Sequence, residues 1–359
     1  MNRKFSRTLA VGSASTFLLF GLAACGGSSD DEGNAEGLSG TLNGGGASSQ
    51  ESAVAAWRQG FQNDNADVTV NYDPVGSGGG REQFIAGGLS FAGSDAFLDE
   101  EELTAATERC ASDIVSVPVY VSPIAVIYQV EGVKDLKLDA ATLGAIFEGK
   151  ITKWNDDAIK ALNPDAKLPD LKVTPVHRAD DSGTTKNFTD YLTAASGGTW
   201  SGGVVETWPI KGGEAADGTS GVVSAVKGGT GTIGYADASQ AGDLATVQIK
   251  VGDEFVSPTA EAAAQVLDTA EREEGRVDSD IALKIDRTTT ASGVYPVVMV
   301  SYQIACQEYE DKDEQALVKS WLTWVASEEG QKAAAESAGS APLSKDFAAT
   351  VKEAIDTIG

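Results

Sequence analysis

The chain has 359 residues, of which 42% are hydrophobic, and its 27 basic against 53 acidic side chains give a formal net charge of −26. This length exceeds one ordinary hydrophobic core and predicts two domains or one large two-lobed unit. The acidic balance argues against nucleic acid as a partner, because phosphate backbones are bound mainly through Lys and Arg.

The N-terminus has the pattern of an export signal. Residues 1–24 contain a basic start, an apolar run ending in TFLLFGL, and small residues before Cys25. The apolar run is shorter than the roughly 20 residues that a membrane-spanning helix needs. The sequence LAAC at 22–25 resembles the lipobox of bacterial lipoproteins, in which the cysteine is lipidated and becomes the mature N-terminus. The alternative is an ordinary secretory signal with a cysteine there by chance. Removal of residues 1–24, which hold three basic and no acidic side chains, would change the net charge from −26 to −29.

Residues 25–37 predict a lipidated cysteine followed by a flexible acidic tether, because GGSSDDEGNAEG has nothing to bury. Export also bears on the remaining cysteines. With Cys25 as the anchor, Cys110 and Cys306 form an even pair in a compartment that permits disulfides. We expect a bridge between them, with two buried free thiols as the alternative.

From residue 38 onward, predicted strands alternate with predicted helices, which indicates an α/β architecture. Residues 38–46 form a short strand and a glycine turn, and Val54, Trp57 and Phe61 share one face of a helix at 48–61. The remaining predicted elements, in chain order, are a strand and glycine turn at 67–80, a helix at 81–89, a β-rich run at 117–130, a helix and turn at 142–154, a helix, turn and strand at 219–237, a β-rich run at 295–306, and an amphipathic helix at 315–333.

Three turns share one design, in which a strand ends, a Gly/Ser/Thr stretch follows and a helix begins. They are GGGASSQ at 44–50, GSGGG at 76–80 and DSGTT at 181–185. A helix N-terminus has unpaired backbone N–H groups and partial positive charge, and glycine lets a ligand approach that backbone. Ser and Thr are also ordinary helix caps, so one such turn indicates little. Three of them, with Arg178 beside the third, favour a shared anion site.

These segments resemble the phosphate-binding protein of the bacterial high-affinity phosphate ABC transporter. The resemblance runs from about residue 38 to the C-terminus. The segments that carry it are GGGASS, VGSGGG, FAGSDAFL, TLGAIFEGKITKWNDDAIKALNP, RADDSGTT and GTIGYAD, of which RADDSGTT and the SDAFL part of FAGSDAFL are the most specific. It implies a type II periplasmic-binding-protein fold, with two α/β lobes joined by two crossover strands and the ligand in the cleft. Lobe 1 would comprise 38–119 plus 295–359, and lobe 2 would comprise 120–294. Both Cys110 and Cys306 then belong to lobe 1.

The resemblance also implies which residues contact phosphate. The contacts carried over to this sequence are Ser48, Ser49, Ser77, Asp95, Arg178, Ser182, Gly183 and Thr184. Asp180 matches the acid that pairs with the arginine. The family usually has Thr followed by an aromatic residue where this chain has Ser48-Ser49. The hydroxyl at 48 is kept, and an amide contact at 49 does not depend on the side chain.

The chemistry of these residues fits an oxyanion that still carries a proton. Arg178 offers a planar fork for two oxygens, and Asp180 could hold that guanidinium in place unless it is a plain surface or turn acid. An ionised Asp95 can only accept hydrogen bonds, so it favours hydrogen phosphate and disfavours sulfate, which has no proton to offer. The alternative for Asp95 is a loop acid that caps a helix or forms a salt bridge.

The expected function is therefore high-affinity binding of inorganic phosphate outside the cytoplasm and its delivery to a membrane permease, by cleft closure and without catalysis. We expect a monomer held to the outer face of the cell membrane through Cys25, with no cofactor, metal or nucleic acid. Three alternatives stay open: a binder of another oxyanion, an exported phosphate-ester hydrolase, and a structural or adhesive lipoprotein. The hydrolase is disfavoured because the chain has one histidine, His177, and no HExxH or Cys/His ligand spacing.

Overall fold

The computed structural model describes residues 37–359. The predicted signal peptide and Cys25, together with the tether up to residue 36, lie outside the described residues. Within residues 37–359 the main sheet has nine strands, eight of which follow the order β2-β1-β3-β14-β4-β8-β6-β7, while β9 pairs with β4. The strands are β1 (Gly40–Gly46), β2 (Val68–Asp73), β3 (Phe91–Ser94), β4 (Ile114–Gln129), β6 (Thr174–Arg178), β7 (Glu214–Ala216), β8 (Thr232–Asp237), β9 (Ala245–Thr246) and β14 (Val298–Cys306).

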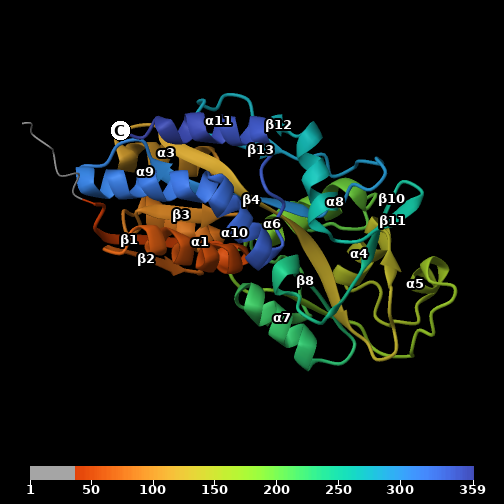
Figure 1. Cartoon of the computed structure of the whole chain (residues 1–359). Helices are drawn as coiled ribbons and strands as arrows, with labels where there is room; N and C mark the ends of the chain where they lie inside the picture. The colour runs from red at the N-terminus through yellow and green to blue at the C-terminus, as the bar shows by residue number, and fades with distance from the viewer. Residues whose placement is uncertain (1–36) are drawn as a thin grey trace, which may run out of the picture. The chain divides into compact units, whose positions relative to one another are not determined.

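Strand β4 is shared by two groups of elements. Its residues 114–123 pair with β14, and its residues 124–129 pair with β8. Where the partner changes, the amide of Ile124 donates to the carbonyl of Val297, at 2.7 Å. Figure 1 shows β4 running from the body that carries α1, α9, α10 and α11 to the body that carries α4, α5 and α7. The β-rich runs predicted at 117–130 and 295–306 therefore lie side by side.

The first body packs helices on β1, β2, β3 and β14. Trp57 and Phe61 of α1 (Glu51–Asp64) are buried, as their spacing predicts, and Phe61 meets the ring of Trp321 edge to face at 5.5 Å. The predicted amphipathic helix at 315–333 is two helices, because Ser327 ends the first and its hydroxyl accepts from the amide of Gly330 to start the second. The helices of this body are α1, α2 (Ser77–Ile85), α3 (Glu100–Cys110), α9 (Lys312–Ala326), α10 (Glu328–Ala338) and α11 (Lys345–Asp356).

The second body surrounds β6, β7 and β8. Phe188 lies between Phe147, at 4.9 Å between ring centroids, and Tyr235, at 4.4 Å, so an aromatic core ties two helices to the sheet. Its helices are α4 (Ala140–Phe147), α5 (Asp157–Leu162), α6 (Gly183–Ala195) and α7 (Gly218–Gly228), and its small sheet is β5 (Lys137–Leu138), β10 (Gln248–Val251) and β11 (Glu254–Val256). Helix α8 (Ala260–Ala264) packs through Ala263 on Val121 and Val298, where β4 and β14 pair.

One segment that the sequence assigned to lobe 2 contacts the first body. The hairpin of β12 (Glu271–Arg272) and β13 (Leu283–Lys284) belongs to this segment. The amide of Ser116 donates to Ser279, and the amide of Ile281 donates back to Ser116, at 2.9 and 2.8 Å. Residues 279–281, which the sequence assigned to lobe 2, therefore pair with the part of β4 that belongs to the first body.

Helix α2 begins earlier than the sequence predicts. It starts at Ser77 and ends at Ile85, so the glycines of 78–80 form its first turn and are not a separate loop. A Cβ on Gly80 would lie 2.4 Å from the Cα of Gly46. The glycines are therefore needed for a close approach between the helix and β1, which overrides their low helix propensity.

Candidate functional site

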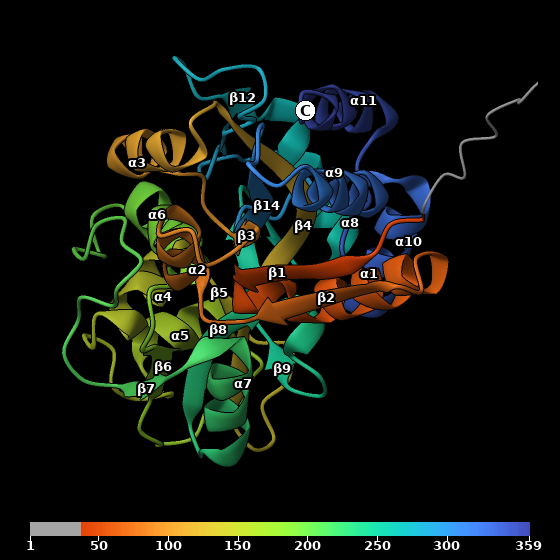
Figure 2. The same cartoon turned by 90° about the vertical axis from the view of Figure 1, so that its left-hand side faces the viewer.

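Helix starts converge at the ends of the sheet strands. The short 3-10 helix η1 (Ser48–Gln50) follows β1, α2 follows β2, α6 follows β6 and α7 follows β7. Figure 2 views the side on which α2 and α6 come together, and there the amide of Gly78 donates to the carbonyl of Asp181, at 3.2 Å. The hydroxyls of Ser48 and Thr219 lie 3.1 Å apart and join η1 to α7. Such a convergence of helix N-termini favours an anion.

Asp95 lies at the centre of this convergence, directly after β3. Its carboxylate accepts from three hydroxyls: those of Ser49 and Ser301 on Oδ1, each at 2.6 Å, and that of Thr184 on Oδ2, at 2.9 Å. Its backbone amide donates to the hydroxyl of Ser77, at 3.1 Å. The residue is 3% exposed, so these contacts replace water.

The surroundings of Asp95 affect both its pKa and the number of hydrogen bonds that it can still accept. Burial raises the pKa of this carboxyl, while the hydroxyls of Ser301, Ser49 and Thr184 and the charge of Arg178 act to lower it. A carboxylate has about four acceptor positions, and three are taken by these hydroxyls. Among the described residues, Oδ1 of Asp95 accepts from two hydroxyls and Oδ2 from one.

Arg178, the last residue of β6, is held by Asp180. Nε of Arg178 donates to Oδ1 of Asp180 at 2.7 Å, and a second guanidinium nitrogen contacts Oδ2. The amide of Gly218 at the start of α7 also donates to Asp180, at 3.1 Å. Burial acts to raise the pKa of Asp180, but the hydrogen bond and charge of Arg178 outweigh burial and lower it. The guanidinium is thereby fixed in a planar, paired geometry.

Glycines bring the two sides of the site together. A Cβ on Gly183, at the start of α6, would lie 2.5 Å from the hydroxyl oxygen of Ser77 and 2.7 Å from Cβ of Asp95. Gly76, whose φ is +91°, faces Asp180 just as closely, at 2.5 Å from an ideal Cβ to Oδ2. Any side chain at either position would hold α2 and α6 apart.

The structure places all the predicted contact residues in one buried cluster. Ser182 caps α6 by accepting from the amide of Thr185, at 3.1 Å. Ser48 is bound through its carbonyl by Gln240, at 2.8 Å. The members are Ser48, Ser49, Ser77, Asp95, Arg178, Ser182, Gly183 and Thr184, all buried, with Asp180 beside them.

Three residues that the sequence did not single out belong to the same cluster. Ser301 donates to Asp95 from the middle of β14, where a lone serine in an apolar run was the available signal. Thr219 bonds Ser48 from a fourth strand-Gly-helix turn, at 214–219, which has the same design as the other three. Asn187 of α6 donates to the carbonyls of Asp95, at 2.6 Å, and Gly183, at 2.9 Å.

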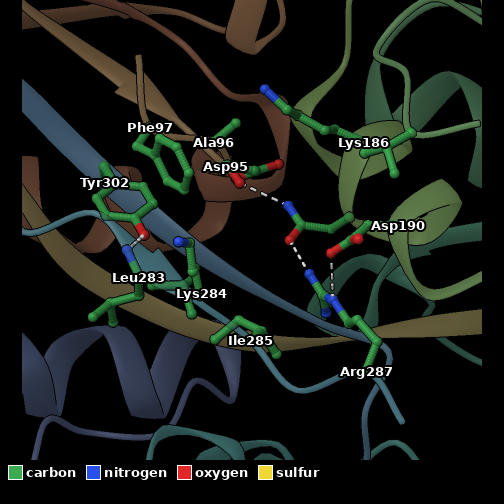
Figure 3. A pocket seen from close by; sticks show the side chains of 13 residues that line it. Asp95, Ala96, Phe97, Lys186, Asp190, Leu283, Lys284, Ile285, Arg287 and Tyr302 are labelled. Atoms are coloured by element: carbon green, nitrogen blue, oxygen red, sulfur yellow. Dashed lines mark hydrogen bonds and ion pairs between the residues drawn. The ribbon is translucent and has the colours of Figure 1, made fainter. Parts of the chain in front are cut away.

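Asp95 also lines a neighbouring cavity of about 420 Å³. Figure 3 shows Arg287 at the edge of this cavity, bound to Asp190. Arg287 also donates to the side-chain amide oxygen of Asn187, whose nitrogen donates to the carbonyl of Asp95. Arg287 donates as well to the carbonyls of Pro296 and Val298, at 3.0 and 2.6 Å. A continuous set of hydrogen bonds therefore runs from the place where β4 changes partner to the backbone of Asp95.

Residues 37–359 were also compared with the requirements of a metal site and of a membrane span, and they meet neither. No group of three or more His, Cys, Asp or Glu side chains there is arranged to hold a metal ion. In the same range, no helix combines the length and apolar character that a membrane span requires.

Comparisons with known proteins bear on the family. A profile described as the PBP superfamily domain matches residues 33–329. Phosphate-binding protein PstS 3 of Mycobacterium tuberculosis (strain CDC 1551 / Oshkosh) is 34% identical over 324 residues, which cover 89% of this chain and 86% of that protein. The chain belongs to the phosphate-binding protein family of the PBP superfamily. Phosphate-binding protein PstS 2 of M. tuberculosis is 32% identical over 373 residues, covering 99% of this chain and all of that protein.

Solved structures agree on the fold. The phosphate-bound structure of the periplasmic phosphate-binding protein PfluDING superposes with a TM-score of 0.72 at 22% identity, over 88% of this chain and 93% of that one. The phosphate-binding protein from Stenotrophomonas maltophilia gives a TM-score of 0.66 at 19% identity, over 88% and 94%. The predicted periplasmic-binding-protein fold is thus confirmed.

Proposed function

We propose that this protein binds inorganic phosphate outside the cytoplasm and delivers it to the membrane permease of a phosphate ABC transporter, without catalysing a reaction. Relatives that match nearly the whole chain are named phosphate-binding proteins. The observation that carries the proposal is the buried Asp95 carboxylate, which receives three hydroxyl donors and keeps one acceptor position.

Phosphate would be bound by the residues that surround this carboxylate. Arg178 supplies charge-assisted donors, and the N-termini of η1, α2 and α6 supply backbone N–H groups and hydroxyls. The proton of hydrogen phosphate would occupy the remaining acceptor position on Asp95. Sulfate has no proton at neutral pH, so its oxygen would face the carboxylate without a hydrogen bond.

Closure of two lobes would bury the ligand. Contacts between the proposed lobes, such as those of Thr184 and Asn187 with Asp95, support this motion. The two chain segments that pass between the bodies meet at Ile124 and Val297, where a hinge would act.

The remaining parts of the proposal concern location and assembly. We propose that residues 1–24 are a signal peptide, that a lipid on Cys25 anchors the chain to the outer face of the cell membrane, and that residues 26–37 are a tether. The protein would act as a monomer, with the permease as its protein partner. Mass spectrometry of membrane-extracted protein tests the anchor, since lipidation adds a diacylglyceryl mass at Cys25.

Calorimetry of the purified full chain with phosphate, sulfate and a phosphate monoester tests the ligand. We expect sub-micromolar binding of phosphate, which corresponds to more than about 8 kcal/mol, with far weaker binding of sulfate and no turnover of the ester. Equal binding of sulfate would favour a general oxyanion binder, and release of phosphate from the ester would favour a hydrolase. Absence of phosphate binding at neutral pH would overturn the proposal.

A further inference from the structure

Arg81 is a buried cation close to the site that no step so far uses. It lies in α2, and its side chain is 5% exposed. Each of its three nitrogens has its own partner: Nε donates to Glu102 at 2.8 Å, one terminal nitrogen donates to Ser94 at 2.9 Å, and the other donates to Glu206 at 2.7 Å. Glu102 and Ser94 belong to the same body as Arg81, whereas Glu206 belongs to the loop that follows α6.

Glu206 contacts the start of α6, on the opposite side of the candidate anion site from Arg81. Its carbonyl accepts from the amide of Ser182, at 3.3 Å, so the loop is fixed to the start of α6. Its carboxylate also forms an ion pair with Lys186 of α6, at 3.2 Å. Burial acts to raise the pKa of Glu206, but the charges of Arg81 and Lys186 outweigh burial and lower it. The carboxylate is therefore held in its ionised form between two cations.

Glycine at position 78 lets the start of α2 approach the turn before α6 closely. A Cβ on Gly78 would lie 2.6 Å from Cβ of Asp181 and 3.4 Å from a carboxylate oxygen of Glu206. The start of α2, the turn before α6 and the loop at Glu206 are thus in direct contact.

We propose that Arg81 and Glu206 form a latch between the two lobes, which closes when phosphate binds and slows its release. This inference rests on the proposed phosphate binding by closure. Arg81 also braces Ser94, the residue before Asp95, so the latch links closure to the position of that carboxylate.

Arg81 and Glu206 each have other partners in their own lobe, so their mutual contact stabilises only the closed form. If the lobes separate, Arg81 keeps Glu102 and Ser94, and Glu206 keeps Lys186, so neither charge is left buried alone. Of the contacts that these two side chains make, only the one between Arg81 and Glu206 is lost. Buried, hydrogen-bonded charge pairs at interfaces act mainly on dissociation rates, whereas exposed charges act on association.

The test is the Glu206→Gln variant of the full chain, with phosphate association and release measured by rapid mixing and by chase of bound labelled phosphate. We expect the release rate to rise about tenfold and the association rate to change less than about twofold. Glu206→Asp keeps the charge but shortens its reach, and is expected to raise the release rate to a similar extent. Arg81→Met is measured as well, and in an Arg81→Met/Glu206→Gln double variant the increase should be smaller than the product of the two single increases, since both substitutions break the same contact.

Asp170→Asn is the matched control, because it removes one carboxylate from the exposed pair with Lys153, at 2.7 Å, within the second body. Its release rate should equal that of the wild type, and the melting temperatures of ligand-free Glu206→Gln and Asp170→Asn should be alike. Wild-type release rates in both Glu206 variants, with phosphate still bound, would overturn the latch and leave the proposed function intact. Failure of the wild-type chain to bind phosphate would overturn both.

Discussion

The hydroxyl oxygen of Thr184 lies 2.9 Å from Oδ2 of Asp95, a residue 89 positions earlier in the chain. This contact joins the start of α6 to the end of β3, and so joins the two bodies of the fold at the proposed ligand. Because a hydroxyl donates to each oxygen of Asp95, the carboxylate is oriented as an acceptor.

Replacement of Asp95 with Asn should exchange phosphate selectivity for general oxyanion binding. An amide can donate as well as accept, so the unfavourable contact with sulfate is relieved while the acceptor for the phosphate proton is weakened. We expect the ratio of phosphate to sulfate affinity to fall at least about 100-fold, because sites built around a specific hydrogen bond discriminate strongly. Competition calorimetry at neutral pH measures the ratio.

Asp157→Asn is the control for this experiment, since it removes the same charge from an exposed side chain of α5. It should leave the selectivity unchanged. If Asp95→Asn kept the wild-type ratio, the role proposed for the carboxylate would be wrong.

Replacement of Asp180 with Asn should weaken phosphate binding by misplacing Arg178. Asn keeps one acceptor oxygen but loses the negative charge and the second acceptor, so the two-point pairing with the guanidinium is lost. We expect an affinity loss of about tenfold or more, as for other buried charge pairs from which one partner is removed. Titration calorimetry measures it, and an unchanged affinity would contradict the bracing role.

The same pair predicts a pH dependence of stability. The pKa of Asp180 is lowered in the folded protein, so its contribution is present above the unfolded pKa and is lost as pH falls through the folded pKa. The unfolding free energy of the wild type should therefore drop more steeply than that of Asp180→Asn below about pH 4. Urea unfolding between pH 3 and 6 compares the two.

Local patterns made the elements and most members of the candidate cluster predictable. Helix and strand periodicity placed Trp57 and Phe61 in the core, and the Gly/Ser/Thr turns located three of the helix starts at the site. The break at Ser327 was missed because apolar spacing continues across it, and only the cap geometry shows that a new helix begins.

Side-chain contacts between residues far apart in the sequence could not be predicted from local patterns. Ser301 sits in a strand whose other residues are buried, so nothing local distinguishes a hydroxyl aimed at Asp95 from one that merely fits. Glu206 lies in an irregular segment with no period to place it, and its pairing with Arg81 follows only from how the two bodies meet. Sequence patterns constrain neighbours along an element, whereas these contacts depend on tertiary packing.

Cys110 and Cys306 offer a prediction about the first body. Their sulfurs lie at bonding distance, with the Cα atoms 5.4 Å apart, at the ends of α3 and β14. We expect protein isolated from outside the cytoplasm to show no free thiol at these positions. A Cys110→Ala/Cys306→Ala variant should lose about 2–5 kcal/mol of stability, because the bridge closes a long loop in the unfolded chain. Thiol titration under denaturing conditions and urea unfolding check both points, and two reactive thiols in the exported protein would contradict the bridge.

Asp237, at the end of β8, predicts a second pH effect of opposite sign to that of Asp180. It is fully buried and accepts from the hydroxyl of Tyr120, at 3.0 and 3.1 Å, and from the amide of Ser239, at 2.8 Å. Burial raises its pKa to about 6, although the hydrogen bonds from Ser239 act to lower it.

Because the folded pKa of Asp237 exceeds the unfolded value, the folded state binds the proton more tightly. Its contribution is complete below the unfolded pKa, near 3.8, and is lost as pH rises through about 6. The stability of Asp237→Asn relative to wild type should therefore increase by about 2 kcal/mol between pH 4 and 7, since a pKa difference of one unit corresponds to about 1.4 kcal/mol. Urea unfolding of both proteins across this range measures the difference.

Tyr120→Phe is the matched control, since it removes one hydrogen bond but no titrating carboxyl, and its stability relative to wild type should vary less with pH. A relative stability of Asp237→Asn that stays constant from pH 4 to 7 would show that Asp237 titrates normally.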